Sequence, residues 1–481
     1  MNYKNKILYL TTFFSSFLFA ENNISSIEYK HFNDLKEIEV NSASPKLTKI
    51  TVDTEDISRD EEIEISDQQL AKNPQLIHYF LNLAIDKNRP ELIPDLVAMY
   101  KKYQYHDPIL IDYALGEYAH YQQDYTEAIN IYQKLLEKYP NINKIRYKLA
   151  QWQFEDKSFN SAKQNFSQLQ QQKLPYFIQK RIAAYQYAIQ QDNEFDFEMG
   201  VNFLNENNIN NASSQPYIYL ANRRFNKSPD SLPQKGKGFA YYINLEKSFN
   251  IADHQKFLFN NLLSGKYYWN NKKYNDIENR ALVGYQYQNA KNRMSISPLF
   301  EKRWFDQKQY SHSYGLRFEN DIKLANKWQS SFAFEYTKTN YKNKSNPHYK
   351  QLYSTTLVYL ADSKKYFYIG SDVLLDNTIN LQEKSRRYAI RMGWKQDWDY
   401  YVSTKIGIQF AKRFFKEKEY LFNKKRFDTE YDLTLNIWKR DFSIFGVVPK
   451  IQYKYHKTRS TIPDFYSFKK QQINLLFEKD F

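Results

Sequence analysis

Few residues of this chain have the types and the spacing that catalysis or metal binding requires. The eight histidines are scattered, and neither a His-Glu-x-x-His motif nor a cluster of histidines and carboxylates appears. Ser467 and Lys470 have the Ser-x-x-Lys spacing of a nucleophile and its base, but on a strand an odd separation places them on opposite faces. Gly236 and Gly238 lack the strand-loop-helix context of a phosphate-binding loop. We therefore expect no metal, no cofactor and no enzymatic activity.

The composition indicates which kind of element carries the function instead. Aromatic residues make up 18% of the 481 residues, yet the mean hydropathy is −0.78 and 26% of residues are charged. A helix needs about 20 consecutive apolar residues to span a membrane, and no stretch after the N-terminus approaches this length. Membrane insertion would therefore use strands, whose polar face hides the apolar face from hydropathy averages. The absence of cysteine excludes disulfides, thiolate metal sites and a lipidated N-terminal cysteine.

The first 20 residues have the pattern of a signal peptide. Lys4 and Lys6 give a basic start, residues 7–19 form an apolar centre, and Ala20 precedes a plausible cleavage site before Glu21. An uncleaved membrane anchor is the alternative, but an apolar centre of about 13 residues is short for a membrane span. The pattern predicts export.

Residues 21–72 are polar and acidic, with 13 Asp or Glu against 6 Lys or Arg. This composition predicts a flexible tether. A calcium loop is the alternative, but Ile57 and Ser58 interrupt the alternation of oxygen ligands that an EF-hand needs.

Residues 73–191 have helical periodicity and an internal repeat at a shift of about 34, which is the tetratricopeptide period. The alignment at this shift places Leu115 on Leu149, Gly116 on Ala150, Tyr125 on Phe159, Ala128 on Ala162, Tyr132 on Phe166 and Leu135 on Leu169. The small residues suit the points where two helices of a hairpin cross, and the aromatic residues suit the space between hairpins. An unrelated helical bundle is the alternative. We predict a short tetratricopeptide-like array that helices at both ends cap.

From residue 195 to the end, apolar and polar residues alternate with a period of two, which is typical of strands with one apolar face. The first such run contains Phe195, Phe197, Met199, Val201 and Phe203. The predicted strands start near Phe195, Phe239, Phe257, Arg280, Met294, Tyr310, Trp328, Leu352, Tyr366, Tyr388, Tyr401, Phe427, Phe442 and Gln472. About fourteen strands of roughly 10 residues predict a transmembrane antiparallel β-barrel over 195–481. A soluble β-sandwich is the alternative, and the abundance of Tyr and Trp for interfacial girdles disfavours it.

The last predicted strand ends the chain with an apolar face. Ile473, Leu475, Phe477 and the terminal Phe481 share this face, a pattern that resembles the signal read by the barrel-assembly machinery. Lys479 on the same face departs from the usual pattern.

The positive charge of the chain lies in the predicted barrel. The leader carries +2, the tether −7 and residues 73–194 +1, so that a total of +15 leaves +19 for residues 195–481. The basic residues are spread over turns and one strand face and are not concentrated on one helix, which argues against nucleic acid as a partner. Anionic lipid head groups or a polar lumen explain the charge better.

A signal peptide, a short tetratricopeptide array and a C-terminal barrel, in this order, resemble the surface lipoprotein assembly modulators, known as Slam proteins. The resemblance covers residues 73–481. It depends on the architecture, on the barrel that ends in Phe481, and on the repeat residues Leu115, Gly116, Ala128 and Pro140.

The resemblance implies a translocon in the outer membrane with its repeats in the periplasm. Its clients would be surface lipoproteins or secreted haem-binding proteins, often used in iron acquisition. Further expected partners are the barrel-assembly machinery, periplasmic chaperones and outer-membrane lipids. An exopolysaccharide exporter, a passive porin and an outer-membrane enzyme with an adhesive helical domain are the alternatives. We further hypothesise that clients pass unfolded at the junction of the first strand (195–203) and the last (473–481), because strand addition needs only backbone partners.

Overall fold

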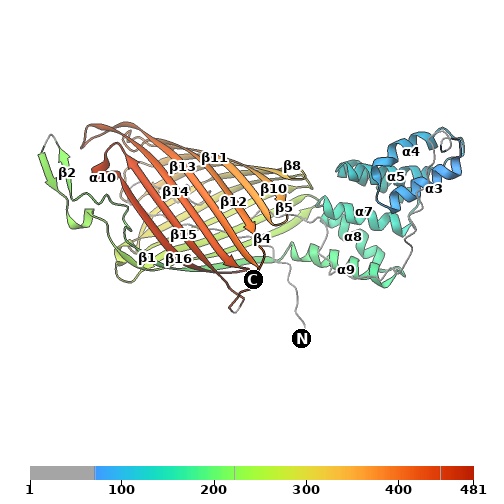
Figure 1. Ribbon diagram of the computed structural model, residues 1–481, viewed down its shortest axis with the longest axis horizontal. Coiled ribbons are helices and arrows are strands. Elements are labelled where there is room, and N and C mark those ends of the chain that lie inside the picture. The colour runs from blue at the N-terminus through green and yellow to red at the C-terminus, as the bar shows by residue number, and fades with distance from the viewer. Residues whose placement is uncertain (1–69, 71, 221–222, 445, 481) are drawn as a thin grey trace.

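The computed structural model describes residues 70, 72–220, 223–444 and 446–480, which form a helical array followed by a closed β-barrel (Figure 1). The predicted cleavage site at Ala20 and Glu21, most of the acidic tether and the terminal Phe481 lie outside the described residues.

Within residues 72–191, the described part of the array contains seven α-helices and one short 3₁₀ helix. Their order is α3 (Pro74–Asp86), η1 (Pro90–Leu92), α4 (Ile93–Tyr100), α5 (Pro108–Tyr121), α6 (Tyr125–Lys138), α7 (Asn143–Glu155), α8 (Phe159–Gln170) and α9 (Tyr176–Gln191). Local sequence explains where several of them begin. The side chains of Asn73 and Asp107 accept hydrogen bonds from backbone N–H groups in the first turns of α3 and α5, and a proline follows each of them. Among the described residues, no helix is both long and apolar enough to span a membrane.

The predicted repeat forms two successive helical hairpins, α5–α6 and α7–α8. A Cβ atom on Gly116 would lie 2.3 Å from Cε2 of Tyr132, so this crossing requires glycine. In the next hairpin Ala150 and Phe166 occupy the equivalent positions and are fully buried. Of the predicted packing residues, Gly116, Ala128, Tyr132, Leu149, Ala150, Phe159, Ala162 and Phe166 are buried, and Leu115 and Tyr125 are half-buried. The predicted tetratricopeptide-like fold of the array is therefore confirmed.

The barrel consists of fourteen antiparallel strands, as the alternation predicted. Its strands are β1 (Phe195–Glu206), β4 (Gly236–Ala252), β5 (Gln255–Tyr268), β6 (Asp276–Gln288), β7 (Asn292–Phe305), β8 (Lys308–Ala325), β9 (Trp328–Tyr341), β10 (His348–Asp362), β11 (Lys365–Asn377), β12 (Ser385–Asp397), β13 (Val402–Glu419), β14 (Lys424–Lys439), β15 (Val448–Ser460) and β16 (Phe468–Asp480). Each strand pairs with its neighbours in the chain, and β1 also pairs with β16.

One predicted strand start was wrong. Phe442 lies in the turn after β14, and the next strand begins at Val448. Ile444 forms an isolated bridge with Val447 around Gly446, which has a φ of 79°, so the chain reverses within a run that has the pattern of apolar alternation. A short hairpin outside the barrel, β2 (Tyr217–Leu220) and β3 (Arg223–Asn226), and the one-turn helix α10 (Pro463–Tyr466) were not predicted.

Apolar side chains face outward and polar side chains face the lumen. On β12, Tyr388, Ile390 and Met392 are exposed, whereas the intervening Ala389 and Arg391 are buried. The lumenal charges pair across neighbouring strands. Arg391 donates to Asp372 with an Nε–Oδ2 distance of 2.7 Å, for example. An apolar exterior around a polar, ion-paired interior is the arrangement of a transmembrane barrel.

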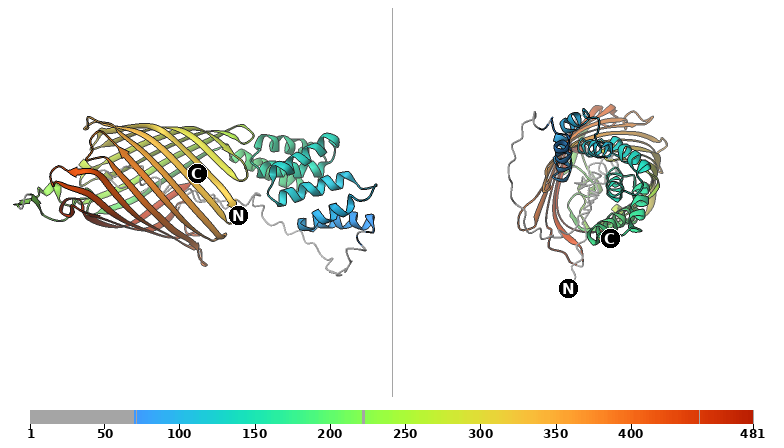
Figure 2. Two further views of the ribbon diagram at one scale, coloured as in Figure 1. Left: turned by 90° about the horizontal axis from the view of Figure 1, so that it is seen from above. Right: turned by 90° about the vertical axis from the view of Figure 1, so that its right-hand side faces the viewer.

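The two ends of the barrel differ. The array lies at one end, where β1 begins and β16 terminates (Figures 1 and 2). Most turns at this end are short, such as residues 253–254 and 289–291, whereas longer connections lie at the opposite end, among them 207–235 with β2 and β3.

Candidate functional site

The junction of β1 and β16, which we call the seam, is paired over only part of its length. Among the described residues, β1 and β16 form five residue pairs, from Glu198↔Asp480 to Asn202↔Leu476. On its other side β1 pairs with β4 along all twelve of its residues, and β16 pairs with β15 from Phe468 to Glu478. The edges at 203–206 and 472–475 therefore face each other without ladder hydrogen bonds. Such edges are ready to accept another strand.

The predicted seam residues lie on the outer face of these two strands. Phe195, Met199, Val201 and Phe203 of β1 and Ile473 and Leu475 of β16 are exposed, whereas Phe197 and Phe477 are half-buried. The structure therefore brings the first predicted strand and the last side by side, with their apolar side chains pointing out of the barrel.

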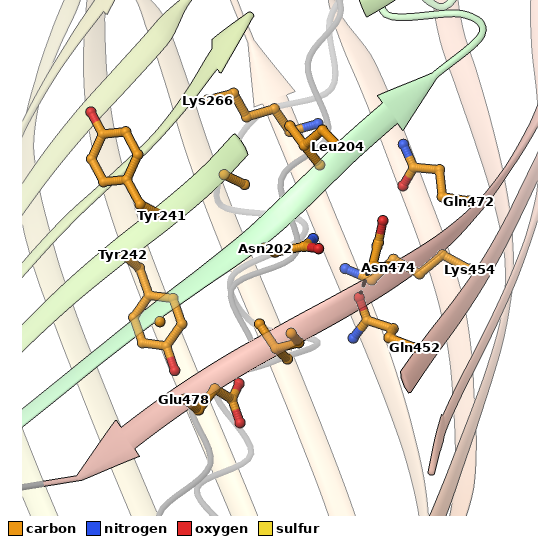
Figure 3. Close-up of a pocket in the computed structure, with 13 residues that line it drawn as sticks. Asn202, Leu204, Tyr241, Tyr242, Lys266, Gln452, Lys454, Gln472, Asn474 and Glu478 are labelled. Carbon is orange, nitrogen blue, oxygen red and sulfur yellow. Dashed lines mark hydrogen bonds between the residues drawn. The ribbon is translucent and has the colours of Figure 1, made fainter. Parts of the chain in front are cut away.

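A pocket opens on the lumenal side of the seam, between β1, β4, β5, β15 and β16 (Figure 3). It is lined by Gly200, Asn202, Leu204, Ala240, Tyr241, Tyr242, Lys266, Gln452, Lys454, Gln472, Asn474, Leu476 and Glu478. Gly200 permits Tyr242 to lie over β1, because a Cβ atom there would be 2.2 Å from the Tyr242 ring. The Tyr242 hydroxyl donates to Glu198 at 2.5 Å.

Two acceptor atoms at this pocket lack partners. Oδ1 of Asn202 and Oε1 of Glu478 are buried without a hydrogen bond in the part of the chain that the structure describes. A buried acceptor without a donor costs about 1–3 kcal/mol. These two atoms are thus available to a donor that enters the seam.

Basic side chains converge on the same wall. Lys266 of β5 pairs with Glu206 at 2.7 Å, and the Tyr268 hydroxyl donates to the same carboxylate at 2.9 Å. Lys470 of β16 donates to Asn211 at 2.7 Å, and Lys454 of β15 lies within electrostatic range of both other lysines. The sequence analysis did not predict this group of lysines, although the alternation of β15 and β16 places Lys454 and Lys470 on the polar face.

The array docks against the barrel end through the first turn of α8. The Asp253 carboxylate, in the turn between β4 and β5, accepts hydrogen bonds from the backbone N–H groups of Asn160 at 2.9 Å and Ser161 at 3.1 Å. Ser158, the N-cap residue of α8, makes no capping hydrogen bond of its own. Asp253 therefore caps α8 from the other domain.

A second contact surrounds His254 in the same turn. Its Nε2 lies 2.9 Å from Oδ2 of Asp156 and 2.8 Å from Oγ of Ser158. The hydrogen bond with Asp156 raises the pKa of His254 above its ordinary value of 6.5. Asp156 also accepts from the backbone N–H of Ala290 in the next turn at 3.1 Å. The array thus contacts two neighbouring turns of the barrel.

The connection between the domains adds a third contact. Lys256 of β5 donates to both carboxylate oxygens of Asp192 at 2.8 and 2.6 Å, and the Ser248 hydroxyl donates to the Asp192 carbonyl at 2.9 Å. Because Asp192 directly follows α9 and β1 begins at Phe195, the array has little freedom to swing away.

Both domains match known families. The family described as "Surface lipoprotein assembly modifier" matches residues 195–481, and "Surface lipoprotein assembly modifier, N-terminal TPR repeats" matches residues 63–166. Among the curated relatives, "Surface lipoprotein assembly modifier 1" of Haemophilus influenzae is 33% identical over 87% of both chains. "Surface lipoprotein assembly modifier" of Pasteurella multocida is 30% identical over 92% of this chain and 89% of its own. "Hemophilin secretion modulator" of Acinetobacter baumannii is 23% identical over 85% and 86%.

Proposed function

This chain belongs to the surface lipoprotein assembly modifier family, and on that premise we propose that it is a translocon for surface proteins. It delivers surface lipoproteins, or secreted proteins related to hemophilin, from the periplasm to the cell surface. The names of the relatives support this function, and they disfavour an exopolysaccharide exporter or a passive porin. The observation that carries the proposal is a closed barrel with a partly paired seam and with a repeat array docked against the turns at one end.

The chain is an outer-membrane protein with its array on the periplasmic side. Outer-membrane barrels have short periplasmic turns and longer extracellular loops. The array lies at the end with most of the short turns, which supports this orientation (Figure 1). The hairpin of β2 and β3 then lies outside the cell.

The array receives the client and presents it to the barrel. A tetratricopeptide array provides an extended surface for a peptide or protein. Because the array is held against the barrel end by Asp253, His254 and Lys256, a bound client has a high local concentration at the barrel mouth.

The client crosses in an unfolded form along the seam. The unpaired edges at 203–206 and 472–475 offer backbone donors and acceptors, which an extended segment of any sequence can use. A barrel of fourteen strands is narrow for a folded domain. Folding or capture of the client outside the cell gives the movement its direction.

Partners other than the client follow from the same surfaces. The barrel-assembly machinery recognises the outward apolar face of β16, with Ile473, Leu475 and Phe477. Outer-membrane lipids contact the exposed apolar side chains of all strands, and periplasmic chaperones keep the chain soluble before insertion.

A transport assay with a lockable seam tests the function. This chain and a candidate client lipoprotein are expressed in a bacterium that lacks both, and antibody against the client labels intact cells. We expect surface labelling only when this chain is present. Equal labelling without it, across all candidate clients, contradicts the function.

The lock is a pair of cysteines in a chain that has none of its own. If the ladder of the seam continued, Phe203 would lie opposite Leu475, so Phe203→Cys with Leu475→Cys bonds when the two edges meet. Oxidation should stop transport and reduction should restore it. Val201→Cys with Tyr241→Cys is the control, because it joins two strands that are already paired. Full transport through an oxidised seam contradicts this route.

A further inference from the structure

Three lysines lie beside the seam, and fewer carboxylates surround them than surround other charged groups of the lumen. Lys266, Lys454 and Lys470 come from three different strands and lie within electrostatic range of one another. We call these three residues the lysine cluster. Two of its members lie on β15 and β16, and Lys266 and Lys454 line the pocket of Figure 3.

Carboxylates near the cluster are too few to balance it. Glu206 pairs with Lys266, and Glu478 pairs with Lys450, a fourth lysine. Asp432 also lies within electrostatic range of Lys470, and it pairs with His456. Within the described residues, neither Lys454 nor Lys470 forms an ion pair with a carboxylate, and the contact of Lys470 is the neutral amide oxygen of Asn211. Four lysines against three carboxylates leave an excess positive charge in a largely buried place.

Several lumenal arginines, in contrast, have carboxylate partners. Glu335 accepts from both Arg280 and Arg317 at 2.5 and 2.9 Å, and Glu430 similarly lies between Arg387 and Arg413. A buried ammonium group without an anion is costly, because the protein interior solvates it poorly. An incoming carboxylate would therefore find its strongest unmet attraction at the lysine cluster.

The unpaired edge of β16 determines which side chains of an added strand would face the lumen and which would face lipid. Lumenal side chains of β16 recur at every second residue, with Lys470 and Asn474 buried on either side of Gln472. A strand added along 472–475 would point alternate side chains into the lumen and the rest toward lipid. Its lumenal side chains would face the lysine cluster, and its outer side chains would join the apolar faces of Phe203 and Ile473.

We propose that the seam selects an extended client segment with carboxylates on alternate residues and apolar side chains between them. This inference depends on the proposed function for the identity of the ligand as client. The added strand takes up the unpaired backbone of β1 and β16, and its carboxylates pair with Lys454 and Lys470.

Peptide binding to the full-length protein in lipid nanodiscs tests the proposal. The probes are two fluorescent ten-residue peptides, one alternating Glu with Val and one alternating Lys with Val, which share strand propensity and differ in the sign of charge. We expect the Glu peptide to bind at least about tenfold more tightly, and added salt to weaken it. A photoreactive residue in the Glu peptide should label β1 or β16.

A matched pair of variants locates the site. Lys454→Gln with Lys470→Gln should weaken binding of the Glu peptide about tenfold. Lys308→Gln with Lys418→Gln removes the same charge from exposed positions and should leave binding unchanged. Heat-modifiable migration on gels establishes that both variants are folded.

Equal binding of the two peptides, equal effects of the two variants, or labelling confined to the array overturns the proposal. These outcomes are distinct from failure of the transport function. If the oxidised seam stops transport while both peptides bind equally, the route stands and the selection for carboxylates is wrong.

Discussion

Replacing Asp253 should loosen the array from the barrel without unfolding either domain. This carboxylate caps α8 across the domain boundary, through the backbone N–H groups of Asn160 and Ser161 and through the Ser161 hydroxyl. We therefore expect Asp253→Ala to shift the equilibrium between docked and undocked arrays.

The size of the shift follows from the hydrogen bonds that the alanine cannot make. A helix cap contributes about 0.5–2 kcal/mol, and a hydrogen bond to a charged group about 1.5–3 kcal/mol. Because Asp253 is half-exposed, we expect a cost in the lower part of these two ranges, about 1–2 kcal/mol. This cost corresponds to a 5- to 30-fold decrease in the equilibrium constant for docking. Asp253→Asn keeps one acceptor oxygen for the two backbone N–H groups. It loses the second oxygen, which accepts from the Ser161 hydroxyl, and the attraction of the carboxylate charge for the helix dipole, which is about 0.3–1 kcal/mol.

Distances between spin labels measure the docking. Labels on Gln164→Cys in α8 and Ser363→Cys in the turn between β10 and β11 occupy exposed positions of a chain without native cysteine. The distance distribution should be narrow in the parent, slightly broader for Asp253→Asn and clearly broader for Asp253→Ala. Asp399→Ala, in another turn at the same end, is the control, because this side chain is 90% exposed. A distribution for Asp253→Ala as narrow as that of the parent refutes the capping role.

The remaining predictions concern pH, assembly and packing. Docking raises the pKa of His254 through its hydrogen bond with Asp156, so its contribution to docking is complete below pH 6.5 and is lost as the pH rises through the raised pKa. The same spin labels should report this loss, and His254→Gln should remove the pH dependence. Phe477→Asp places a charge on the lipid face of β16 at a cost of about 1–2 kcal/mol, and the heat-modifiable form on gels should decrease. Unchanged folded protein would mean that this face does not meet lipid. Gly116→Ala drives a methyl group into the Tyr132 ring, so thermal unfolding of the array should be destabilised by about 1–3 kcal/mol, and an unchanged transition would contradict the close crossing.

The amino-acid sequence by itself determined the two fold classes and the faces of their elements. Alternation with a period of two and a repeat of 34 residues are local patterns, because side-chain direction follows directly from backbone geometry. Fourteen strands were therefore predictable, as was the outward face of Phe203 or Ile473. The predicted strand start near Phe442 was wrong, because the tight turn at Gly446 interrupts an otherwise regular alternation of apolar and polar residues.

Only the tertiary structure decided where the seam remains open and what surrounds it. The extent of pairing between β1 and β16 depends on the closure of the whole barrel, which no local pattern records. The lysine cluster joins strands more than 180 residues apart in the chain, and Asp253 caps a helix that begins 94 residues earlier. Local sequence patterns do not show which distant residues will be in contact, because only closure of the barrel and docking of the domains bring their charges and backbone groups together.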